Sequence, residues 1–436
     1  MERKIGGGSV SLTKRNFLKA GGVMAMGAGL AACSATSASE PTESADAPVL
    51  KNMSGNAVPI TIEERRARIA KAQRLMGEQG IDAVVIEPGA AMTYFSGVQW
   101  WRSERLVALV IPKEGEVSIV APYFEEPSIL ESLKVGDNVR TWHEHENPSE
   151  VVKTVLDDRG VGTGTIGLEE SVRYFVADGL AKAAPQATIV NGAGVTRGCR
   201  MFKSPAEIAL MQIAADVVMA AYRHVATRFE LGMSNTEISA MMRSAISDLG
   251  ARPTFASVLT GEASAYPHGT NAAQVVEENG VILMDCGCTV EGYQADISRT
   301  FVFGEPTQKQ RDVWDTCKRG QEIAMETAKL GVPAGEVDDA VRAYYTSLGY
   351  GPDYQTPGLS HRLGHGIGME GHEPVNFVRG ETTPLQPGMC FSNEPGIYIF
   401  GEFGVRLEDC LYMTEDGPKL FSEFSHTIED PMGLSA

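Results

Sequence analysis

Three features that would direct a functional assignment are missing from this sequence: a basic excess, a zinc-ribbon cysteine pattern and an apolar run of roughly the 20 residues needed to span a membrane. Basic residues number 38 against 56 acidic ones, and the formal net charge of -18 argues against nucleic-acid binding through a basic face. The seven cysteines show no paired metal-ligand spacing. We expect Cys286 and Cys288 to be small core residues. The alternative, a disulfide, would require an oxidising compartment.

The first 54 residues differ in character from the rest of the chain. A basic start precedes the short apolar run Ala20–Ala32, which is typical of a signal peptide. Lys14–Lys19 resembles a twin-arginine signal with lysine in place of the first arginine, and the residues ending in Cys33 resemble a lipobox. We therefore expect residues 1–33 to direct export and Cys33 to carry a lipid anchor, followed by a flexible tether over 34–54. The alternative is an uncleaved tail.

What the chain does have is an ordinary globular composition, 43% hydrophobic and 22% charged, over 436 residues. This length favours two domains. Helical periodicity at 60–80 is followed by short apolar strand patterns, which predicts an α/β domain over residues 55–198. The expected strands lie at 83–86, 106–111, 117–120, 166–168 and 187–190.

A second domain is predicted over residues 199–436. Ser204 followed by proline and Glu207 predicts a helix start, and that helix should run to about Phe229. Ser234 with Glu237 three residues later forms a capping-box pattern that starts another helix. After Gly250 the sequence favours strands and glycine-rich turns, interrupted by one helix from Gln308 to Leu330.

The chemistry-bearing residues begin with an apolar run that ends at Asp285, a turn-like stretch over 286–293 and a predicted return strand that carries Asp296. A buried carboxylate at such a place needs a partner or a metal. A hairpin would bring the two aspartates to one end. The alternative is structural, with one acid solvated and the other paired to Arg299.

Three further segments add histidines and carboxylates. A glycine-rich stretch at 361–374 holds His361, His365 and His372, an apolar strand pattern delivers Glu394 to a turn, and Arg406 and Glu408 are two residues apart. Singly, each segment is more often structural. Together they offer four carboxylates and one imidazole, a ligand set that suits Mn²⁺. The candidate ligands are Asp285, Asp296, His365, Glu394 and Glu408.

These motifs resemble the pita-bread metallopeptidases, which include prolidase, aminopeptidase P and methionine aminopeptidase. The resemblance covers about residues 200–430 and includes the spacing from Asp285 to Asp296 and the Asn393–Gly396 stretch. Methionine aminopeptidases lack an α/β domain like the one predicted here, and creatinase shares the fold without the metal ligands. The resemblance implies an α/β creatinase/prolidase-like N-terminal domain followed by an α+β pita-bread catalytic domain.

The resemblance also implies a role for each site residue. Asp285 would bind one metal, Asp296 and Glu408 would bridge both, and His365 and Glu394 would complete the second. Glu394 would also relay a proton. The residues that match the family's substrate-contacting and catalytic positions are His268, His361, His372 and Arg406, with packing around the site as the alternative for His268 and His361.

The expected function is hydrolysis before proline in an Xaa-Pro dipeptide or peptide, through a hydroxide bridging two divalent ions. Mn²⁺ is the expected ion, with Co²⁺, Fe²⁺ and Zn²⁺ as alternatives. Two other functions stay open: a hydrolase or lyase acting on a non-proline or non-peptide molecule, and a catalytically silent binding protein. The expected partners are a peptide or small amide substrate and a second copy of the chain in a homodimer. The expected location is the cell envelope or another extracytoplasmic site.

Overall fold

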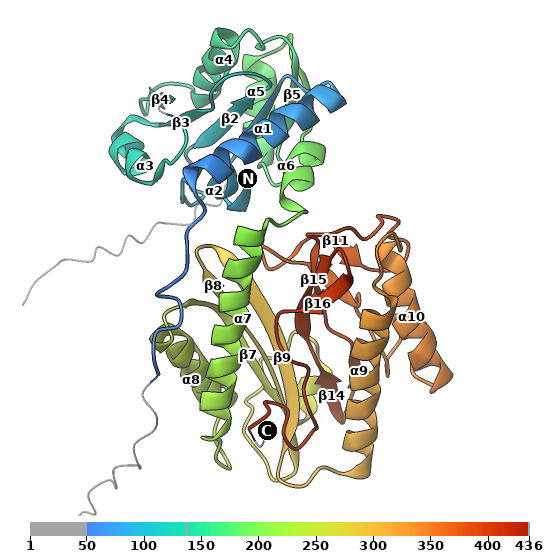
Figure 1. Ribbon diagram of the computed structural model, residues 1–436. Helices are drawn as coiled ribbons and strands as arrows, with labels where there is room; N and C mark the ends of the chain where they lie inside the picture. Colours follow the sequence, from blue (N-terminus) through green and yellow to red (C-terminus); the bar gives the residue numbers. More distant parts are fainter. Residues whose placement is uncertain (1–49, 137, 435–436) are drawn as a thin grey trace, which may run out of the picture. The chain divides into compact units, whose positions relative to one another are not determined.

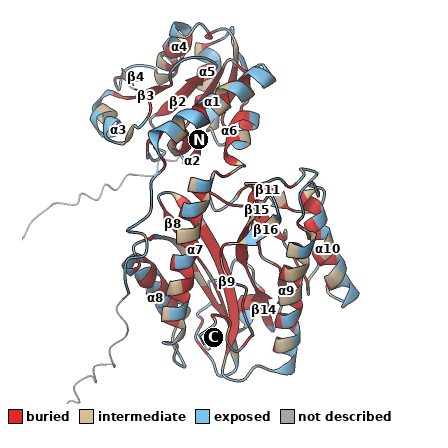
Figure 2. Ribbon diagram, viewed as in Figure 1, coloured by how far each residue is buried: buried red, intermediate tan, exposed pale blue. Residues whose placement is uncertain are grey.

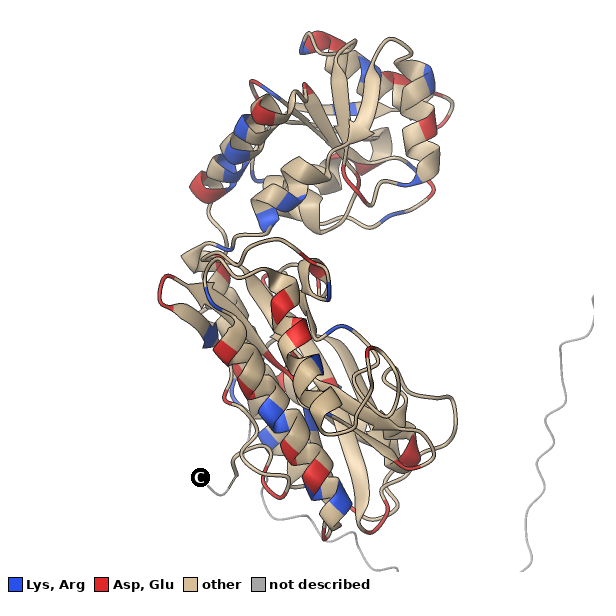
Figure 3. Cartoon of the chain, turned by 90° about the vertical axis from the view of Figure 1, so that its right-hand side faces the viewer, with Lys and Arg blue, Asp and Glu red and all other residues tan. Residues whose placement is uncertain are grey.

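The computed structural model describes residues 50–136 and 138–434 (Figure 1). The predicted export signal, Cys33 and most of the predicted tether lie outside the described residues. Basic and acidic residues are interspersed along the helices in the view of Figure 3. The described chain contains an α/β region followed by a larger α+β region, in the order that the sequence predicts.

The first region is built on a six-stranded sheet with the strand order β4-β3-β2-β1-β5-β6. Its strands β1, β2 and β5 are short and almost entirely buried, because helices cover both faces of the sheet. Val84 packs with one set of helices and its neighbour Val85 with the other, as the two-residue period of a strand requires. The strands are β1 Ala83–Ile86, β2 Ala108–Pro112, β3 Ser118–Pro122, β4 Asn138–Trp142, β5 Thr165–Leu168 and β6 Thr188–Asn191.

Six α-helices accompany this sheet, and their buried sides form two separate cores (Figure 2). One core unites α1, α2, α3 and α6 on one face, and the other contains α4 and α5. The helices are α1 Ile62–Gln79, α2 Ala90–Ser96, α3 Glu126–Ser132, α4 Pro148–Asp158, α5 Tyr174–Ala183 and α6 Ala193–Arg200, with a 3₁₀ turn at Tyr123–Glu125.

The second region opens with two helices that pack on a three-stranded antiparallel sheet. The elements are α7 Pro205–Ala226, α8 Asn235–Asp248, β7 Arg252–Thr260, the 3₁₀ turn Gly261–Ala265, β8 Gly280–Val290 and β9 Tyr293–Phe303. Both predicted capping boxes are present, at Ser204 with Glu207 and at Ser234 with Glu237. By length and composition alone α7 is apolar enough to cross a membrane, but its buried residues pack on β8 and β9.

A second pair of helices packs on a second sheet and completes the region (Figure 1). This five-stranded sheet has the order β11-β10-β12-β15-β16, and β13 and β14 pair separately. The elements are α9 Gln308–Thr327, α10 Ala334–Ser347, β10 Gly364–Gly366, β11 Glu373–Phe377, β12 Cys390–Asn393, β13 Gly396–Ile399, β14 Phe403–Arg406, β15 Asp409–Thr414 and β16 Gly417–Leu420. The two sheets, each with its helix pair, form the α+β arrangement that was expected.

The expected turn over 286–293 is wrong. Strand β8 continues to Val290, and only Glu291 and Gly292 form the turn, both with positive φ, as a two-residue hairpin loop requires. Gly287 signals close packing instead, because a Cβ at this position would lie 2.4 Å from the ring of Phe255. Cys286 and Cys288 are buried and unpaired, which confirms them as core residues.

The helix ends also differ from the prediction. Helix α7 ends at Ala226, three residues before the predicted Phe229, and α9 ends at Thr327. Helix α10 was not predicted at all. It starts after Pro333 without a side-chain cap and has Gly335 in its first turn, so its start carries few of the usual local signals.

Candidate metal centre and substrate cavity

The hairpin of β8 and β9 brings Asp285 and Asp296 to one face of the first sheet. Asp285 pairs with Ser298, and Asp296 lies two residues before Ser298, so both carboxylates point to the same side. They lie within the strands, not at the end of the hairpin as expected. The alternative pairing with Arg299 is wrong, because the buried guanidinium of Arg299 pairs with Asp409.

The second sheet supplies the other three predicted ligands. His365 lies in β10, and Glu394 follows the last residue of β12. Glu408 lies between β14 and β15, where its backbone forms an isolated bridge to Ser298 of β9. Ser298 also donates a hydrogen bond from Oγ to Oε2 of Glu408 at 2.7 Å. This bridge joins the two sheets at the place where their carboxylates meet.

All five predicted ligands come together. One oxygen each from Asp285, Asp296 and Glu408 lies within 4.8 Å of the others, and so do ligand atoms of His365, Glu394 and Glu408. A third group within that distance joins Asp296, His365 and His372. Asp296, His365 and Glu408 each belong to two of these groups, so the three groups form one continuous cluster.

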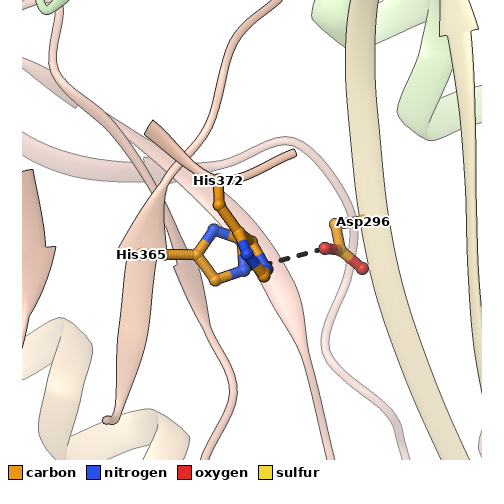
Figure 4. Close-up of side chains that lie close together, drawn as sticks. All are labelled: Asp296, His365 and His372. Atoms are coloured by element: carbon orange, nitrogen blue, oxygen red, sulfur yellow. Dashed lines mark ion pairs between the residues drawn. The ribbon is translucent and has the colours of Figure 1, made fainter. Parts of the chain in front are cut away.

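The imidazole of His365 lies beside the ring of His372 and close to the carboxylate of Asp296 (Figure 4). Its Nδ1 lies 3.1 Å from the carbonyl oxygen of Gly366, which favours a proton on Nδ1 and a free lone pair on Nε2. Nε2 lies 3.4 Å from Oε1 of Glu394 and 3.7 Å from Oδ2 of Asp296. Burial lowers the pKa of His365 to about 3, so the ring is the neutral form that a metal requires.

The electrostatics of the carboxylates favour a cation. Burial and then the charge of Glu408 raise the pKa of Asp296 well above its ordinary value, and burial with the charge of Glu394 does the same for Glu408. Burial also raises the pKa of Glu394 to about 7. Within the described residues, Oδ1 of Asp285 and Oδ1 of Asp296 are buried without a hydrogen-bond partner. Divalent cations would satisfy these oxygens and offset the repulsion.

Arg406 lies beside the carboxylates, and most of its N–H groups donate hydrogen bonds to other residues of the protein. Its Nη2 donates to Oδ2 of Asp285 at 2.6 Å, and its Nε donates to Oγ of Ser298 at 3.0 Å. Nη1 donates to the carbonyl oxygen of Pro267 and, at 3.3 Å, to the hydroxyl of Tyr398. The guanidinium therefore holds Asp285 in place as well as lining the cavity.

A hydrogen-bond chain links Arg406 to His361. The hydroxyl of Tyr398 lies 2.8 Å from Nε2 of His361, and Nδ1 of His361 lies 2.7 Å from the carbonyl oxygen of Arg362. Burial, followed by the charge of Arg406, lowers the pKa of His361 to about 3. A neutral His361 with its proton on Nδ1 accepts a hydrogen bond from Tyr398, which in turn accepts one from Arg406.

The residues predicted to contact substrate surround one cavity of about 320 Å³. His268 and His372 are exposed on its wall, whereas His361 and Arg406 are more buried. The ring centroids of His372 and His365 are 4.1 Å apart. The full lining consists of Pro267, His268, Asp285, Asp296, His361, Arg362, His365, His372, Glu394, Arg406 and Glu408.

Two residues in or next to this cavity were not predicted from the sequence. Arg362 stands between two of the singled-out residues, and Tyr398 closes the motif that carries Glu394. Neither position has a local signal that distinguishes a cavity residue from a surface or core residue. Their importance follows only from the tertiary contacts described above.

A buried ion pair holds the histidine-bearing segment from behind. Arg342 and Asp338 of α10 are bonded through Nε and Oδ2 at 2.7 Å. Arg342 also donates to the carbonyl oxygens of Leu359 and His361, and Asp338 accepts from the backbone N–H of Leu363 at 2.9 Å. The helix that the sequence did not predict therefore positions the cavity wall.

The fold and the site together define a dinuclear metal-dependent hydrolase. Comparisons with known proteins agree with this class. Residues 209–415 match the metallopeptidase family M24, and residues 68–202 match the creatinase/prolidase N-terminal domain. The Xaa-Pro dipeptidase of Lactobacillus helveticus is 32% identical over 367 residues, which cover 83% of this chain and 97% of that protein.

Solved structures give the same result. Dipeptidase PepE from Mycobacterium ulcerans superimposes with a TM-score of 0.79 at 30% identity, covering 85% of this chain and 99% of that one. A recombinant prolidase from Thermococcus sibiricus gives a TM-score of 0.76 at 27% identity, covering 82% and 97%. The chain belongs to metallopeptidase family M24, and its fold is a creatinase-like domain followed by a pita-bread catalytic domain.

Proposed function

We propose that this metallopeptidase is an Xaa-Pro peptidase that cleaves the bond before proline in a dipeptide or short peptide. The observation that carries the proposal is the convergence of all five candidate ligands on one small cavity that also contains His268 and His372. The similarity to an Xaa-Pro dipeptidase over 83% of the chain supports the choice of substrate.

Each side chain has a role in this proposal. Asp285, Asp296, His365, Glu394 and Glu408 would hold two divalent ions, which would act as Lewis acids on the scissile carbonyl and activate water for attack. Glu394 would also relay a proton to the leaving nitrogen, because it lies in the wall of the same cavity. His268 and His372 face the cavity and would orient the substrate carbonyl.

Mn²⁺ is the proposed ion, because four carboxylates and one neutral imidazole form an oxygen-rich ligand set. Co²⁺, Fe²⁺ and Zn²⁺ are the alternatives to be compared with it. Metal-free protein reloaded with each ion, followed by metal analysis and activity measurement, tests the choice. Equal or higher activity with another ion at equal occupancy would remove Mn²⁺ as the preferred cofactor.

The decisive experiment is hydrolysis of matched Xaa-Pro and Xaa-Ala dipeptides by Mn²⁺-loaded protein. Asp296→Asn should abolish cleavage and reduce metal content, because Asp296 belongs to two ligand groups. Asp216→Asn changes an exposed aspartate of α7 and should behave as wild type. Cleavage that ignores proline, or activity only on non-peptide amides, would contradict the proposed specificity while leaving the metallopeptidase family assignment intact.

The same protein is proposed to work outside the cytoplasm as a homodimer with a lipid on Cys33. The signal-peptide pattern of residues 1–33 supports export, and the resemblance to prolidases supports the dimer. Mass spectrometry of membrane-extracted protein should find a mature N-terminus at lipidated Cys33. An unmodified chain that begins at Met1 would contradict the export proposal, and a monomer in light scattering would contradict the dimer.

A further inference from the structure

A second cavity, of about 260 Å³, lies at one edge of the six-stranded sheet. Its wall includes Glu87, the residue that follows β1, and Glu169, the residue that follows β5. Because β1 and β5 are parallel neighbours, both residues lie at the carboxyl ends of their strands and at the same edge of the sheet. Helix α2 follows β1 and packs in one core, whereas α5 follows β5 and packs in the other core, on the opposite face. Ligands of open α/β sheets bind at such a place, where neighbouring strands connect to opposite faces.

Glu169 is a buried carboxylate of this cavity with one oxygen left over. Its side chain is 6% exposed. Oε2 accepts hydrogen bonds from the backbone N–H of Ser171 at 3.0 Å and from its hydroxyl at 2.6 Å, whereas Oε1 accepts none from any described residue. Burial raises the pKa of Glu169 above its usual range, because the carboxylate has lost most of its contact with water. A cationic group in the cavity would supply the missing partner.

Arg102 brings a positive charge to the same cavity. Its Nε donates to the carbonyl oxygen of Pro88 at 2.9 Å, and its Nη2 donates to Oγ of Ser171 at 2.5 Å. These two bonds fix the plane of the guanidinium, while Nη1 donates to no residue in the described part of the chain. Nη2 lies 4.0 Å from Oε2 of Glu169, so the two charges are close without a direct hydrogen bond. A fixed guanidinium with free N–H groups is suited to bind a carboxylate.

Two further carboxylates line the cavity, and only one of them is available. Glu87 already accepts from Arg173, through the backbone N–H at 2.7 Å and through Nη2 at 2.6 Å. Glu370 belongs to the catalytic region and is half-exposed. Its Oε2 accepts from Arg200 at 2.6 Å, and its Oε1 accepts from no described residue. One cation, Arg102, and two carboxylates, those of Glu169 and Glu370, are therefore left for a ligand.

This combination of charges fits a zwitterion. An α-amino acid carries a carboxylate for Arg102 and an ammonium group with three N–H donors for the two glutamates. The volume of about 260 Å³ is below the range of about 300–1,000 Å³ for ordinary ligand pockets, so it suits a single amino acid better than a peptide or a nucleotide. The apolar part of the wall is formed by small residues, Pro88, Ala90 and Ala91. Small apolar side chains are therefore the ones that this wall favours.

We propose that this cavity binds a free α-amino acid with a small apolar side chain, whose carboxylate is bound by Arg102 and whose ammonium group is bound by Glu169 and Glu370. Alanine and proline, the products of Ala-Pro cleavage, are ligands of this kind. The choice of natural ligand thus rests on the proposed peptidase function, whereas the site itself does not. Because Glu370 lies between His365 and His372 in the sequence, the ligand would also join the α/β region to the segment that lines the metal centre.

Calorimetric titration of the metal-loaded protein with L-alanine tests the site. Arg102→Gln and Glu169→Gln should each weaken binding by at least about 10-fold, because each removes a charge-assisted hydrogen bond. Arg140→Gln, which alters an exposed arginine of β4, is the matched control and should bind alanine as wild type does. The same titrations in an Asp296→Asn chain separate this site from the metal centre, and alanine binding should persist there.

Two analogues test the two ends of the ligand in wild-type protein. Propionate lacks the ammonium group and alaninamide lacks the carboxylate, so both should bind at least about 10-fold more weakly than alanine. Arg102→Gln should remove the preference for alanine over alaninamide. Equal binding of alanine and either analogue would overturn the zwitterion site, and this comparison needs no variant that could fail to fold.

Two other results would overturn the assignment. Wild-type protein that binds no alanine at millimolar concentration has no such site. Binding that is lost in Asp296→Asn but kept in Arg102→Gln would place the amino acid at the metal centre. None of these titrations requires hydrolysis, so a protein that cleaves no Xaa-Pro substrate would refute the peptidase proposal while the titrations still decide for the amino-acid site.

Discussion

Glu373 forms a buried ion pair, and the loss of stability expected when this residue is replaced can be calculated from its contacts and its pKa. This carboxylate starts β11 and is 4% exposed. It accepts from Nη2 of Arg200 at 2.5 Å and from Nζ of Lys203 at 3.1 Å, and both of those side chains are also buried. Although burial acts against the charged form, Lys203 and then Arg200 lower the pKa of Glu373 to about 2.

The sign and the size of the stability change follow from the difference in the pKa of Glu373 between the folded and the unfolded chain. A glutamate in the unfolded chain has a pKa of about 4.5, and folding lowers the pKa of Glu373 to about 2. Its contribution to stability is therefore fully present above about pH 5 and is lost as the pH falls toward 2. A difference of about 2.5 pKa units corresponds to about 3 kcal/mol. Replacing Glu373 with glutamine should lower the free energy of unfolding by about 3 kcal/mol at pH 7, because two buried cations are left without their anion.

Urea titrations of metal-free wild type and Glu373→Gln between about pH 7 and pH 3 measure this difference. Both proteins keep the same metal-centre carboxylates, so the titration of those groups cancels in the comparison. The gap should shrink by about 2 kcal/mol over this range. Glu370→Gln removes a half-exposed partner of Arg200 and should cost less than about 1 kcal/mol. A gap that is absent at pH 7, or that does not change with pH, would refute the reasoning.

Three other changes test the site and its support. Removing metal with a chelator should abolish hydrolysis and lower the melting temperature, and readdition should restore both; a chelator-treated protein that is free of metal yet fully active would contradict the assigned centre. Tyr398→Phe breaks the link between His361 and Arg406 and should lower kcat/KM by about 10-fold at unchanged metal content, since one hydrogen bond to a charged group is lost; unchanged steady-state kinetics would show that the link is dispensable. Asp338→Asn should lower the free energy of unfolding by about 3 kcal/mol because it leaves the buried Arg342 without its ion pair, whereas Asp339→Asn alters an exposed pair and should have little effect. Equal effects of the two substitutions on thermal unfolding would contradict the supporting role assigned to the Arg342–Asp338 ion pair.

The elements that the sequence predicted correctly are those whose signals lie within a few neighbouring residues. The helix starts at Ser204 and Ser234 were predicted because a capping box is complete within four residues. The buried strands of the first region were predicted because both of their faces are apolar. Helix α10 was missed because its start has no side-chain cap.

The site shows the same division between local and tertiary information. The candidate ligands could be named because a carboxylate in an apolar segment is costly to bury unless it is paired, hydrogen-bonded or bound to a metal. The placement of Asp285 and Asp296 within β8 and β9 could not be predicted, because strand register is fixed by pairing and not by the motif. Arg362 was overlooked for the same kind of reason, since only the tertiary structure places it in the wall of the cavity.

The metal centre is built across two sheets, and this has a consequence for stability as well as for catalysis. Asp296 comes from the first sheet and Glu408 from a segment that bridges to it, and burial with mutual repulsion raises the pKa of both. Bringing these charges together costs free energy that the bridge at Ser298 and the buried Arg406 offset only in part. Ions bound at this point would join the two sheets and remove that repulsion. If the proposed ligands hold the ions, the same residues would serve both the reaction and the stability of the catalytic domain.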